Sequence, residues 1–217
     1  MDSIQGQERN FLPAAGHDWL LPLYDPFVKL AGGNAIRKRL IQLVDIQPGH
    51  AVLEIGCGTG SVVIEVKRSQ PAAQVTGLDP DLKALERAKR KANRKKMTIR
   101  FDQGFSDQLP YPDQSFDRVL SSFMFHHLND QEKEKTLEEA QRVLKPGGSF
   151  YLVDFEKHES GGMLARLFHS HERLKDNSVS RILTLFSKAG FADPKLIDKG
   201  RLLFLDVAYF GTTTQRR

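Results

Sequence analysis

Residues 52–60, Val-Leu-Glu-Ile-Gly-Cys-Gly-Thr-Gly, join an apolar run that carries one carboxylate, Glu54, to three glycines at alternate positions. Gly56, Gly58 and Gly60 allow the backbone to turn sharply and to approach a ligand where a β-carbon would collide with it. The residues that follow predict a helix whose N-terminus closes the site. The pattern therefore predicts a strand, a tight turn and a helix that hold a cofactor almost against the main chain.

The glycine spacing argues against two common cofactor classes. The fingerprint of nicotinamide and flavin cofactors, Gly-x-Gly-x-x-Gly, would need a glycine where this chain has Ser61. The segment also lacks the Gly-Lys-Ser/Thr ending of a phosphate-binding P-loop. A dinucleotide or a nucleoside triphosphate is therefore disfavoured.

Asp79 is the acid that best fits a nucleoside ligand. It ends a short β-favouring run, residues 75–79, about twenty residues after the glycines. A carboxylate at the carboxyl end of a strand can accept two hydrogen bonds from a ribose diol, which is why an acid recurs there in adenosine-binding α/β folds. The alternative is a turn aspartate before Pro80, or a cap for the next helix.

The Gly-x-Gly-x-Gly turn of residues 56–60 resembles motif I of the class I S-adenosylmethionine-dependent methyltransferases. Residues 75–80 are similar to the segment in which the family's second strand ends in an acidic residue. Residues 104–128 contain Leu-Pro-Tyr-Pro-Asp-Gln-Ser-Phe-Asp-Arg-Val-Leu-Ser-Ser and Phe-Met-Phe-His-His-Leu, which resemble the ubiquinone- and menaquinone-biosynthesis type, or type 11 group. Residues 144–148, Leu-Lys-Pro-Gly-Gly, resemble the turn into the fifth strand. Four such segments, in order, carry the resemblance.

The resemblance implies S-adenosylmethionine as the cofactor and a role for each matching residue. The glycines and the Cys57 backbone would support its methionine part. Glu54 would hold the ammonium group directly or through water, and Asp79 would hold the ribose. The expected cofactor-binding set is Glu54, Gly56, Cys57, Gly58, Asp79, Pro80, Gly104, Phe105, Ser106 and Ser122.

The segment that is expected to bind adenine differs from the family pattern. Similar proteins usually have an aspartate for the adenine amino group where this chain has Phe105. Two possibilities stay open: adenine stacks on Phe105 and is held by the backbone of residues 104–106 together with Ser106, or Asp102 holds it after a small shift. Ser122 is expected in the inner wall of the site, near the sulfur.

The reaction implied by the resemblance is an in-line displacement. An oxygen, nitrogen, sulfur or carbanion of the acceptor attacks the sulfonium methyl group and leaves S-adenosylhomocysteine. Holding both partners in line supplies much of the rate enhancement of such a reaction. We expect a small-molecule acceptor. Two alternatives stay open: a methyltransferase acting on RNA or protein, and a regulatory protein that keeps the cofactor site without turnover.

Three residues are candidates for catalysis. His126 and His127 follow the fourth predicted strand, near where the transferable methyl group should point, and Tyr24 lies before the first predicted helix. A histidine there would act as a general base or would hydrogen-bond the loop and shape the cavity. Neither His126-His127 nor His169-x-His171 is joined by a cysteine or carboxylate in a recognised zinc spacing, so no metal is expected.

Short apolar runs alternate with longer helical patterns, which predicts an α/β fold. We expect a Rossmann-like, mostly parallel seven-stranded sheet with helices on both faces and an antiparallel final strand. The predicted strands are 51–55, 74–79, 98–102, 116–121, 149–154, 195–197 and 202–210, and the predicted helices are 34–44, 61–67, 83–96, 130–144 and 179–189.

The 217 residues predict a single domain, and the resemblance implies that it is a methyltransferase domain. Residues 1–45 would form an N-terminal helical lid or cap, residues 46–155 the cofactor-binding core, and residues 156–217 a substrate-wall insertion with the C-terminal helix and strands. The aromatic segment 11–27 predicts a lid, a packed capping helix or a contact with a membrane surface. The segment 158–176, with its glycines and histidines, predicts a substrate wall.

The composition favours a cytoplasmic enzyme. A single cysteine excludes a disulfide framework, and neither a signal-peptide pattern nor an apolar run of about 20 residues is present. The net charge of +5 comes largely from residues 83–96, which predict an amphipathic helix with a solvated basic face. Nucleic-acid binding therefore stays open but is not favoured, and the oligomeric state is not predicted.

Overall fold

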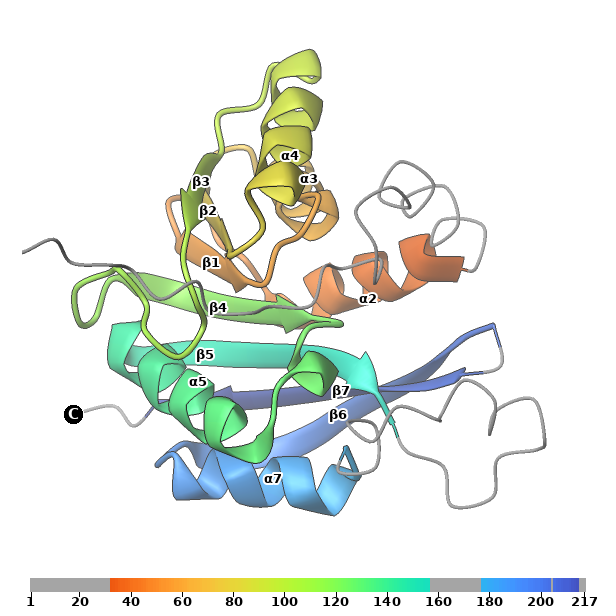
Figure 1. The fold of residues 1–217 in the computed structure, drawn as a ribbon, viewed down its shortest axis with the longest axis vertical. Coiled ribbons are helices and arrows are strands. Elements are labelled where there is room, and N and C mark those ends of the chain that lie inside the picture. Colours follow the sequence, from red (N-terminus) through yellow and green to blue (C-terminus); the bar gives the residue numbers. More distant parts are fainter. Residues whose placement is uncertain (1–31, 157–176, 204, 215–217) are drawn as a thin grey trace, which may run out of the picture.

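Seven segments, most of them apolar runs, fold as the strands of one sheet in the computed structural model, which describes residues 32–156, 177–203 and 205–214 (Figure 1). The strands are β1 (Ala51–Ile55), β2 (Gln74–Asp79), β3 (Arg100–Gln103), β4 (Phe116–Ser122), β5 (Leu144–Phe155), β6 (Ala192–Leu202) and β7 (Leu205–Thr213).

The sheet has the strand order β3-β2-β1-β4-β5-β7-β6. β7 runs antiparallel to both of its neighbours, β5 and β6. The other neighbouring pairs are parallel. The sequence therefore predicted the fold class correctly: a mostly parallel, Rossmann-like sheet of seven strands with an antiparallel final strand is confirmed.

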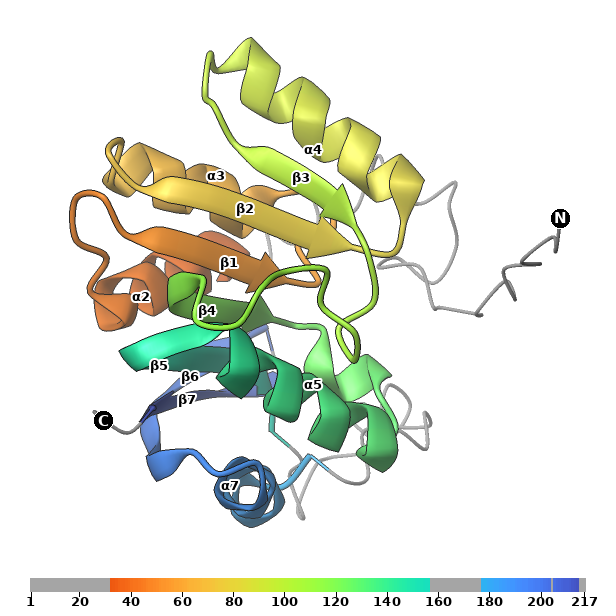
Figure 2. The same cartoon turned by 90° about the vertical axis from the view of Figure 1, so that its left-hand side faces the viewer.

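Helices cover both faces of the sheet (Figure 2). Successive side chains of a strand point to opposite faces, so each face forms its own hydrophobic core with the helices that pack on it. Leu53 and Ile55 of β1 belong to one core, and Val52 belongs to the other. No helix within the described ranges is both long and apolar enough to cross a membrane. The helices are α2 (Asn34–Val44), α3 (Ser61–Ser69), α4 (Leu82–Arg94), α5 (Asp130–Val143), α7 (Val179–Lys188) and the short 3-10 helix η3 (Phe125–His127).

Five strands differ from their predicted bounds. β4 ends one residue later than expected, and β7 begins and ends three residues later. β3 begins and ends one or two residues later than expected. β5 begins earlier, because Phe116 pairs with Leu144 and Arg118 pairs with Ser149, so the Lys-Pro-Gly-Gly turn forms an irregularity inside the ladder between β4 and β5. β6 is much longer than the short run that was predicted, because it pairs with β7 along nearly its whole length as a hairpin.

The topology fixes where a ligand can bind. β1, β2, β4 and β5 are parallel, so their carboxyl ends meet at one edge of the sheet. The strand order reverses between β1 and β4, since the chain leaves β1 for β2 on one side and returns to β4 on the other. Open α/β sheets bind ligands outside the carboxyl ends at such a reversal. The glycine turn follows β1 and therefore lies at this point.

The start of α5 offers a first test of how local sequence stabilises the fold. Asn129 Oδ1 accepts a hydrogen bond from Glu132 N at 2.9 Å, and Glu132 Oε2 accepts one from Asn129 N at 2.8 Å, forming a capping box. Asn129→Ala should lower the free energy of unfolding by about 1 kcal/mol, because the backbone N–H of Glu132 loses its acceptor.

Urea unfolding monitored by circular dichroism measures this effect. Asn93→Ala is the matched control, because Asn93 is exposed within α4 and alanine is the better helix former there. That control should leave the free energy unchanged or raise it slightly. Equal free energies for Asn129→Ala and the unmodified chain would contradict the stabilising role of the cap.

Candidate functional site

The glycine turn between β1 and α3 is held by backbone hydrogen bonds. Gly56 N and Cys57 N donate to the same carbonyl, Leu78 O, at 2.8 and 3.0 Å, and Gly60 N donates to Cys57 O at 2.8 Å. Gly56, Gly58 and Gly60 all have positive φ angles, of 73°, 50° and 76°. The turn is therefore fastened to the carboxyl end of β2 in a conformation that other residues rarely adopt.

The three glycines are required for different reasons. A β-carbon on Gly56 would lie 2.7 Å from Met124 Cβ, and one on Gly60 would lie 2.8 Å from Ala88 Cβ. A β-carbon on Gly58 would meet nothing in the described chain within 4 Å. The sequence pattern suggested that all three glycines make room for a ligand. In the structure, two of them make room for the protein itself, and Gly58 faces space that no described residue fills.

Asp79 points toward the glycine turn. Its Oδ2 accepts a hydrogen bond from Gly58 N at 2.7 Å, and its Oδ1 accepts one from Asp81 N at 2.9 Å. The side chain is largely buried, and this burial raises the pKa of Asp79 to about 6. Each carboxylate oxygen can accept more than one hydrogen bond. Asp79 can therefore hold the turn and still accept bonds from the hydroxyl groups of a ligand.

Glu54 is a buried carboxylate on the other side of the same turn. Its Oε1 accepts a hydrogen bond from Ser122 Oγ at 2.8 Å, and its Oε2 accepts one from Val63 N at 3.2 Å. Only 1% of the residue is exposed, and burial raises the pKa of Glu54 to about 8. In the described part of the chain no lysine, arginine or histidine forms an ion pair with it. Such a carboxylate suits a cationic ligand, which would favour its charged form.

Cys57 fills the space beneath the turn. Its side chain is buried, and burial raises the pKa of the thiol well above its usual value. A β-carbon on Gly77 would lie only 2.8 Å from Cys57 Sγ, so glycine at that position makes room for the thiol. Only the backbone of Cys57 is therefore suited to meet a ligand, as the sequence predicted.

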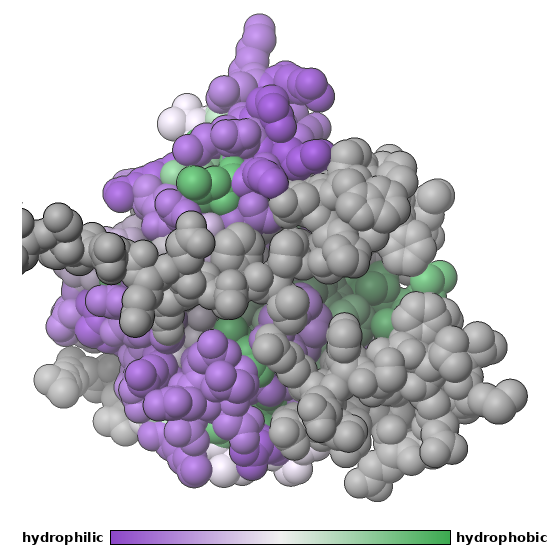
Figure 3. Space-filling view, viewed as in Figure 1, coloured by the Kyte–Doolittle hydropathy of each residue, from purple (hydrophilic) through white to green (hydrophobic). Residues whose placement is uncertain are grey.

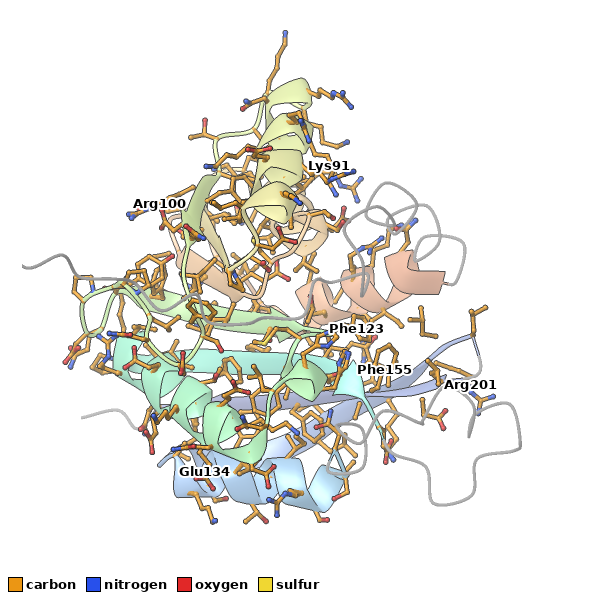
Figure 4. All side chains as sticks on the ribbon, in the orientation of Figure 1. Lys91, Arg100, Phe123, Glu134, Phe155 and Arg201 are labelled. Atoms are coloured by element: carbon orange, nitrogen blue, oxygen red, sulfur yellow. The ribbon has the colours of Figure 1, made fainter. Side chains whose placement is uncertain are left out.

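Lys91 is a site residue that the sequence reasoning missed. It belongs to the basic stretch that was expected to be wholly solvated, but its Nζ donates to Thr59 Oγ1 and to Ser61 Oγ at 3.1 Å each (Figure 4). Lys91 thereby ties α4 to the glycine turn and to the start of α3. Helical spacing alone could not distinguish it from its solvated neighbours, because the contact depends on how α4 packs against α3.

The loop after β3 lies against the end of β2. Gly104 N donates to Asp79 O at 3.3 Å, and a β-carbon on Gly104 would lie 2.9 Å from Leu78 Cδ1. Ser106 Oγ accepts a hydrogen bond from Thr136 Oγ1 at 2.7 Å, which fixes the loop to α5. Phe105 is partly exposed between them.

Asp102, the alternative adenine ligand, has other partners. It accepts a hydrogen bond from the Tyr111 hydroxyl at 3.0 Å and pairs with Arg100 Nε at 2.7 Å. These bonds hold the Asp102 side chain against Arg100 and Tyr111. This favours Phe105 and the backbone of residues 104–106 as the groups that would bind adenine. Pro80 lies next to this loop, because its carbonyl accepts a hydrogen bond from Gln103 Nε2 at 3.2 Å.

His126 lies in η3, just beyond β4, and is bonded to a buried acid. Its Nδ1 lies 2.6 Å from Asp154 Oδ1, and its backbone N donates to Asp154 Oδ2 at 2.9 Å. The His127 ring lies 4.0 Å from that of His126, centroid to centroid. The sequence predicted both histidines for this region and missed Asp154, whose only signal was an acid near the end of an apolar strand.

Several predicted features fall outside the described residues. They are Tyr24, the segments 11–27 and 158–176, and the His169-x-His171 pair. Within the ranges that the structure describes, no three histidine, cysteine, aspartate or glutamate side chains gather in a way that could hold a metal ion.

Comparisons with known proteins agree with this geometry. Residues 52–148 match the family model described as a methyltransferase domain. The chain is 39% identical to the demethylmenaquinone methyltransferase of Deinococcus radiodurans over 122 residues, which are 55% of this chain and 50% of that protein. It is 32% identical to the demethylmenaquinone methyltransferase of Thermus thermophilus over 154 residues, which are 69% of each chain. The alignments thus span about half to two thirds of these relatives.

A solved structure shares the fold. Phosphoethanolamine N-methyltransferase 2 of Haemonchus contortus, in complex with S-adenosyl-L-methionine, superposes with a TM-score of 0.77 over 94% of this chain and 58% of that chain. The sequence identity is 15%, so this likeness concerns the fold alone.

The raised pKa of Glu54 predicts a specific dependence of stability on pH. Below pH 4.5 the carboxyl group is protonated in both the folded and the unfolded chain. Between 4.5 and about 8 the unfolded chain releases this proton and the folded chain keeps it, so stability falls as the pH rises. Glu54→Gln should remove this component, which amounts to a few kcal/mol at about 1.4 kcal/mol per pKa unit.

Urea unfolding at pH 5 and pH 8, without ligand, tests this prediction. The variant should lose less free energy of unfolding between the two pH values than the unmodified chain does. Glu138→Gln, an exposed position on α5, is the matched control and should behave like the unmodified chain. Parallel losses for Glu54→Gln and the unmodified chain would show that Glu54 is not held in its protonated form.

Proposed function

The chain belongs to the class I S-adenosylmethionine-dependent methyltransferases, in the ubiquinone- and menaquinone-biosynthesis group, and on that premise we propose that it methylates a small molecule. S-adenosylmethionine would be the methyl donor and S-adenosylhomocysteine the product. Family and fold were both predicted from the sequence, and the comparisons confirm them.

The observation that carries the proposal is the pair of carboxylates on either side of Gly58. Glu54 is buried without a cationic partner in the described chain, and Asp79 is held against the turn by Gly58 N at 2.7 Å. No described atom lies within 4 Å of the position that a β-carbon on Gly58 would take, so this space is free of the described chain. A ligand with an ammonium group at one end and a sugar diol further along fits this arrangement.

Each residue of the site then has a defined task. Glu54, oriented by Ser122 Oγ, would bind the ammonium group of the cofactor. The backbone of Gly56, Cys57 and Gly58 would support its methionine part, and Asp79 would accept bonds from its ribose hydroxyls. Phe105, with the backbone of residues 104–106, would hold adenine by stacking and hydrogen bonding. The bound cofactor supplies a methyl group on positively charged sulfur, which is a strong electrophile.

A small molecule is the acceptor that the structure and the relatives support best. Two of the relatives are demethylmenaquinone methyltransferases, which act on a small molecule. The basic residues of α4 form a hydrophilic surface in the upper part of the molecule (Figure 3). Most of them follow Ala88, toward the end of α4 that is remote from Asp79, because α4 begins only three residues after Asp79. One of these residues, Lys91, donates to Thr59 Oγ1 and to Ser61 Oγ, so part of the basic charge of α4 holds the glycine turn rather than an external polyanion.

Calorimetry with three ligands tests the proposed function. The chain should bind S-adenosylmethionine and S-adenosylhomocysteine and should not bind NAD. Binding should release protons when the experiment is repeated at pH 7 in buffers of different ionisation enthalpy, because an ammonium group beside Glu54 lowers a pKa that burial has raised to about 8. Tight binding of NAD with none of the sulfonium cofactor would refute the proposal.

A pair of glycine variants separates ligand binding from backbone strain. Gly58→Ala should weaken S-adenosylmethionine binding at least tenfold, because its methyl group would enter the open space that the ligand needs. Gly49→Ala is the matched control: Gly49 also has a positive φ angle, of 82°, and no described atom within 4 Å, but it lies in the turn before β1.

Both variants should lose similar stability, roughly 1–2 kcal/mol, because alanine is strained in the left-handed conformation. Only Gly58→Ala should change the dissociation constant, which calorimetry measures directly. An unchanged dissociation constant for a folded Gly58→Ala variant would place the ligand elsewhere.

A further inference from the structure

The β6–β7 hairpin ends in a turn of large apolar residues. Leu202 pairs with Leu205, which leaves two residues for the turn, Leu203 and, in the sequence, Phe204. Two-residue turns between antiparallel strands are usually built from asparagine, aspartate and glycine, because their backbone adopts positive φ angles. Leu203 has a φ angle of 55°, a conformation that a leucine side chain disfavours. Four apolar residues in a row, 202–205, therefore stand where the fold alone would favour small polar ones.

The tip of this hairpin is also exposed. Leu203 is 53% exposed, whereas Leu202 is 9% exposed and belongs with Val207 to the core that α2 covers. Figure 3 shows hydrophobic surface at the right-hand edge of the molecule, where the hairpin projects in Figure 1. An exposed leucine is common on protein surfaces and needs no explanation by itself. A leucine that is both exposed and strained lowers stability in two ways, which points to a benefit outside the isolated fold.

The charged groups beside the tip present their cations to the outside. Arg201 pairs with Asp206 at 3.2 Å, and Lys199 pairs with Glu156 at 2.7 Å. The side chains of Arg201 and Lys199 are 69% and 55% exposed, whereas those of the two acids are only 17% and 16% exposed. Figure 4 shows Arg201 on the projecting part of the hairpin. A surface that approaches the tip therefore meets an apolar side chain flanked by exposed cationic groups.

The tip lies at the same edge of the sheet as the proposed cofactor site. Phe155, the last residue of β5, pairs with Val207, and Glu156 N donates to Asp206 O at 2.9 Å. Because β7 is antiparallel to β5, the turn before β7 extends past the carboxyl end of β5 (Figure 1). The glycine turn follows β1, which runs in the same direction as β4 and β5. The hairpin and the glycine turn thus share one edge.

We propose that the tip of the β6–β7 hairpin docks on an anionic lipid bilayer, with Leu203 in the interface and with Arg201 and Lys199 at the headgroups. Apolar side chains flanked by lysine and arginine are typical of segments that bind at a membrane surface. Each basic residue adds attraction to anionic lipids, and its long stem keeps the charge at the headgroups while neighbouring side chains enter the apolar layer.

Other occupants fit the tip less well. A nucleic acid would match Arg201 and Lys199 but would hold Leu203 against phosphate groups and water. A second copy of the chain, joined tip to tip, would bring the same exposed cations face to face. A bilayer with anionic headgroups satisfies both the apolar residue and the cations.

Docking at this point would turn the carboxyl edge of the sheet toward the bilayer. An apolar methyl acceptor dissolved in the lipid would then reach the site from the membrane side. This consequence rests on the proposed function, whereas the docking itself does not.

The test replaces the apolar turn with the residues that such turns favour. Leu203→Asn/Phe204→Gly keeps a two-residue turn and removes both apolar side chains. Leu82→Asn is the matched control, because Leu82 is 56% exposed at the start of α4, which packs at the opposite end of the sheet. Flotation without S-adenosylmethionine measures binding to vesicles of phosphatidylcholine alone and to mixed vesicles of equal parts phosphatidylcholine and phosphatidylglycerol.

The unmodified chain and Leu82→Asn should bind the mixed vesicles equally. Leu203→Asn/Phe204→Gly should bind them about tenfold more weakly or worse, because binding grows with the apolar area that enters the interface. The same double variant should unfold at an equal or higher urea concentration than the unmodified chain, since asparagine and glycine suit a left-handed turn. A turn required for packing within the protein would give the opposite result, a lower urea midpoint.

The charge of the tip is tested with a second pair of variants. Arg201→Gln should weaken binding to the mixed vesicles and should not change binding to phosphatidylcholine alone, because only the anionic headgroups attract the guanidinium. Arg68→Gln is the control, since Arg68 is likewise an exposed arginine paired with a less exposed acid, Glu65, but lies on α3. It should change neither measurement.

Four results would overturn the proposal. They are no binding of the unmodified chain to mixed vesicles, unweakened binding of Leu203→Asn/Phe204→Gly, a lower urea midpoint for that variant, and a dimer in sedimentation without lipid that the variant abolishes. The last result would assign the tip to a second copy of the chain. None of these measurements uses the cofactor, so their outcome is independent of the calorimetry that tests the proposed function.

Discussion

The site depends on one crowded junction, where the backbone of the glycine turn donates two hydrogen bonds to Leu78 O at the end of β2. No side chain fits at Gly56 or Gly60, because Met124 and Ala88 already occupy that space. The close approach that these glycines permit brings β1, β2, β4 and α4 together at one point. Asp79 and Glu54 are placed by this junction, and the roles proposed for them depend on it.

The charged groups of the site share a second property. Glu54, Asp79 and Asp154 stand at or near the carboxyl ends of three parallel strands, and each is largely buried. Their hydrogen bonds come from backbone N–H groups, a serine hydroxyl and a histidine ring, and no lysine or arginine of the described chain neutralises them. Burial without a fixed cation raises the pKa of Glu54 and of Asp79, so their charge responds to what binds beside them. Under the proposed function, the sheet offers separate positions for an ammonium group and a sugar.

Much of the fold could be predicted from the sequence, because each central strand is a short apolar run next to a turn signal and each helix has a clear apolar stripe. β6 was underestimated because it is an edge strand whose lysines, aspartates and proline hide its pattern. The expected cofactor residues come from local motifs that can be read along the chain. Asp154 and Lys91 could not be found in this way, because their contacts join residues 28 and at least 30 positions apart and exist only after the sheet and helices have packed. The same limit applies to Gly56 and Gly60, whose neighbours are distant in the chain.

The single cysteine of this protein sits beneath the floor of the glycine turn, enclosed by Gly77 and held in its thiol form by burial. A buried thiol with a raised pKa reacts slowly with oxidants and alkylating reagents. Such reagents should therefore modify Cys57 only slowly as long as the turn stays closed. The rate at which a thiol reagent labels Cys57 therefore measures how often the glycine turn opens locally, and no added probe is needed.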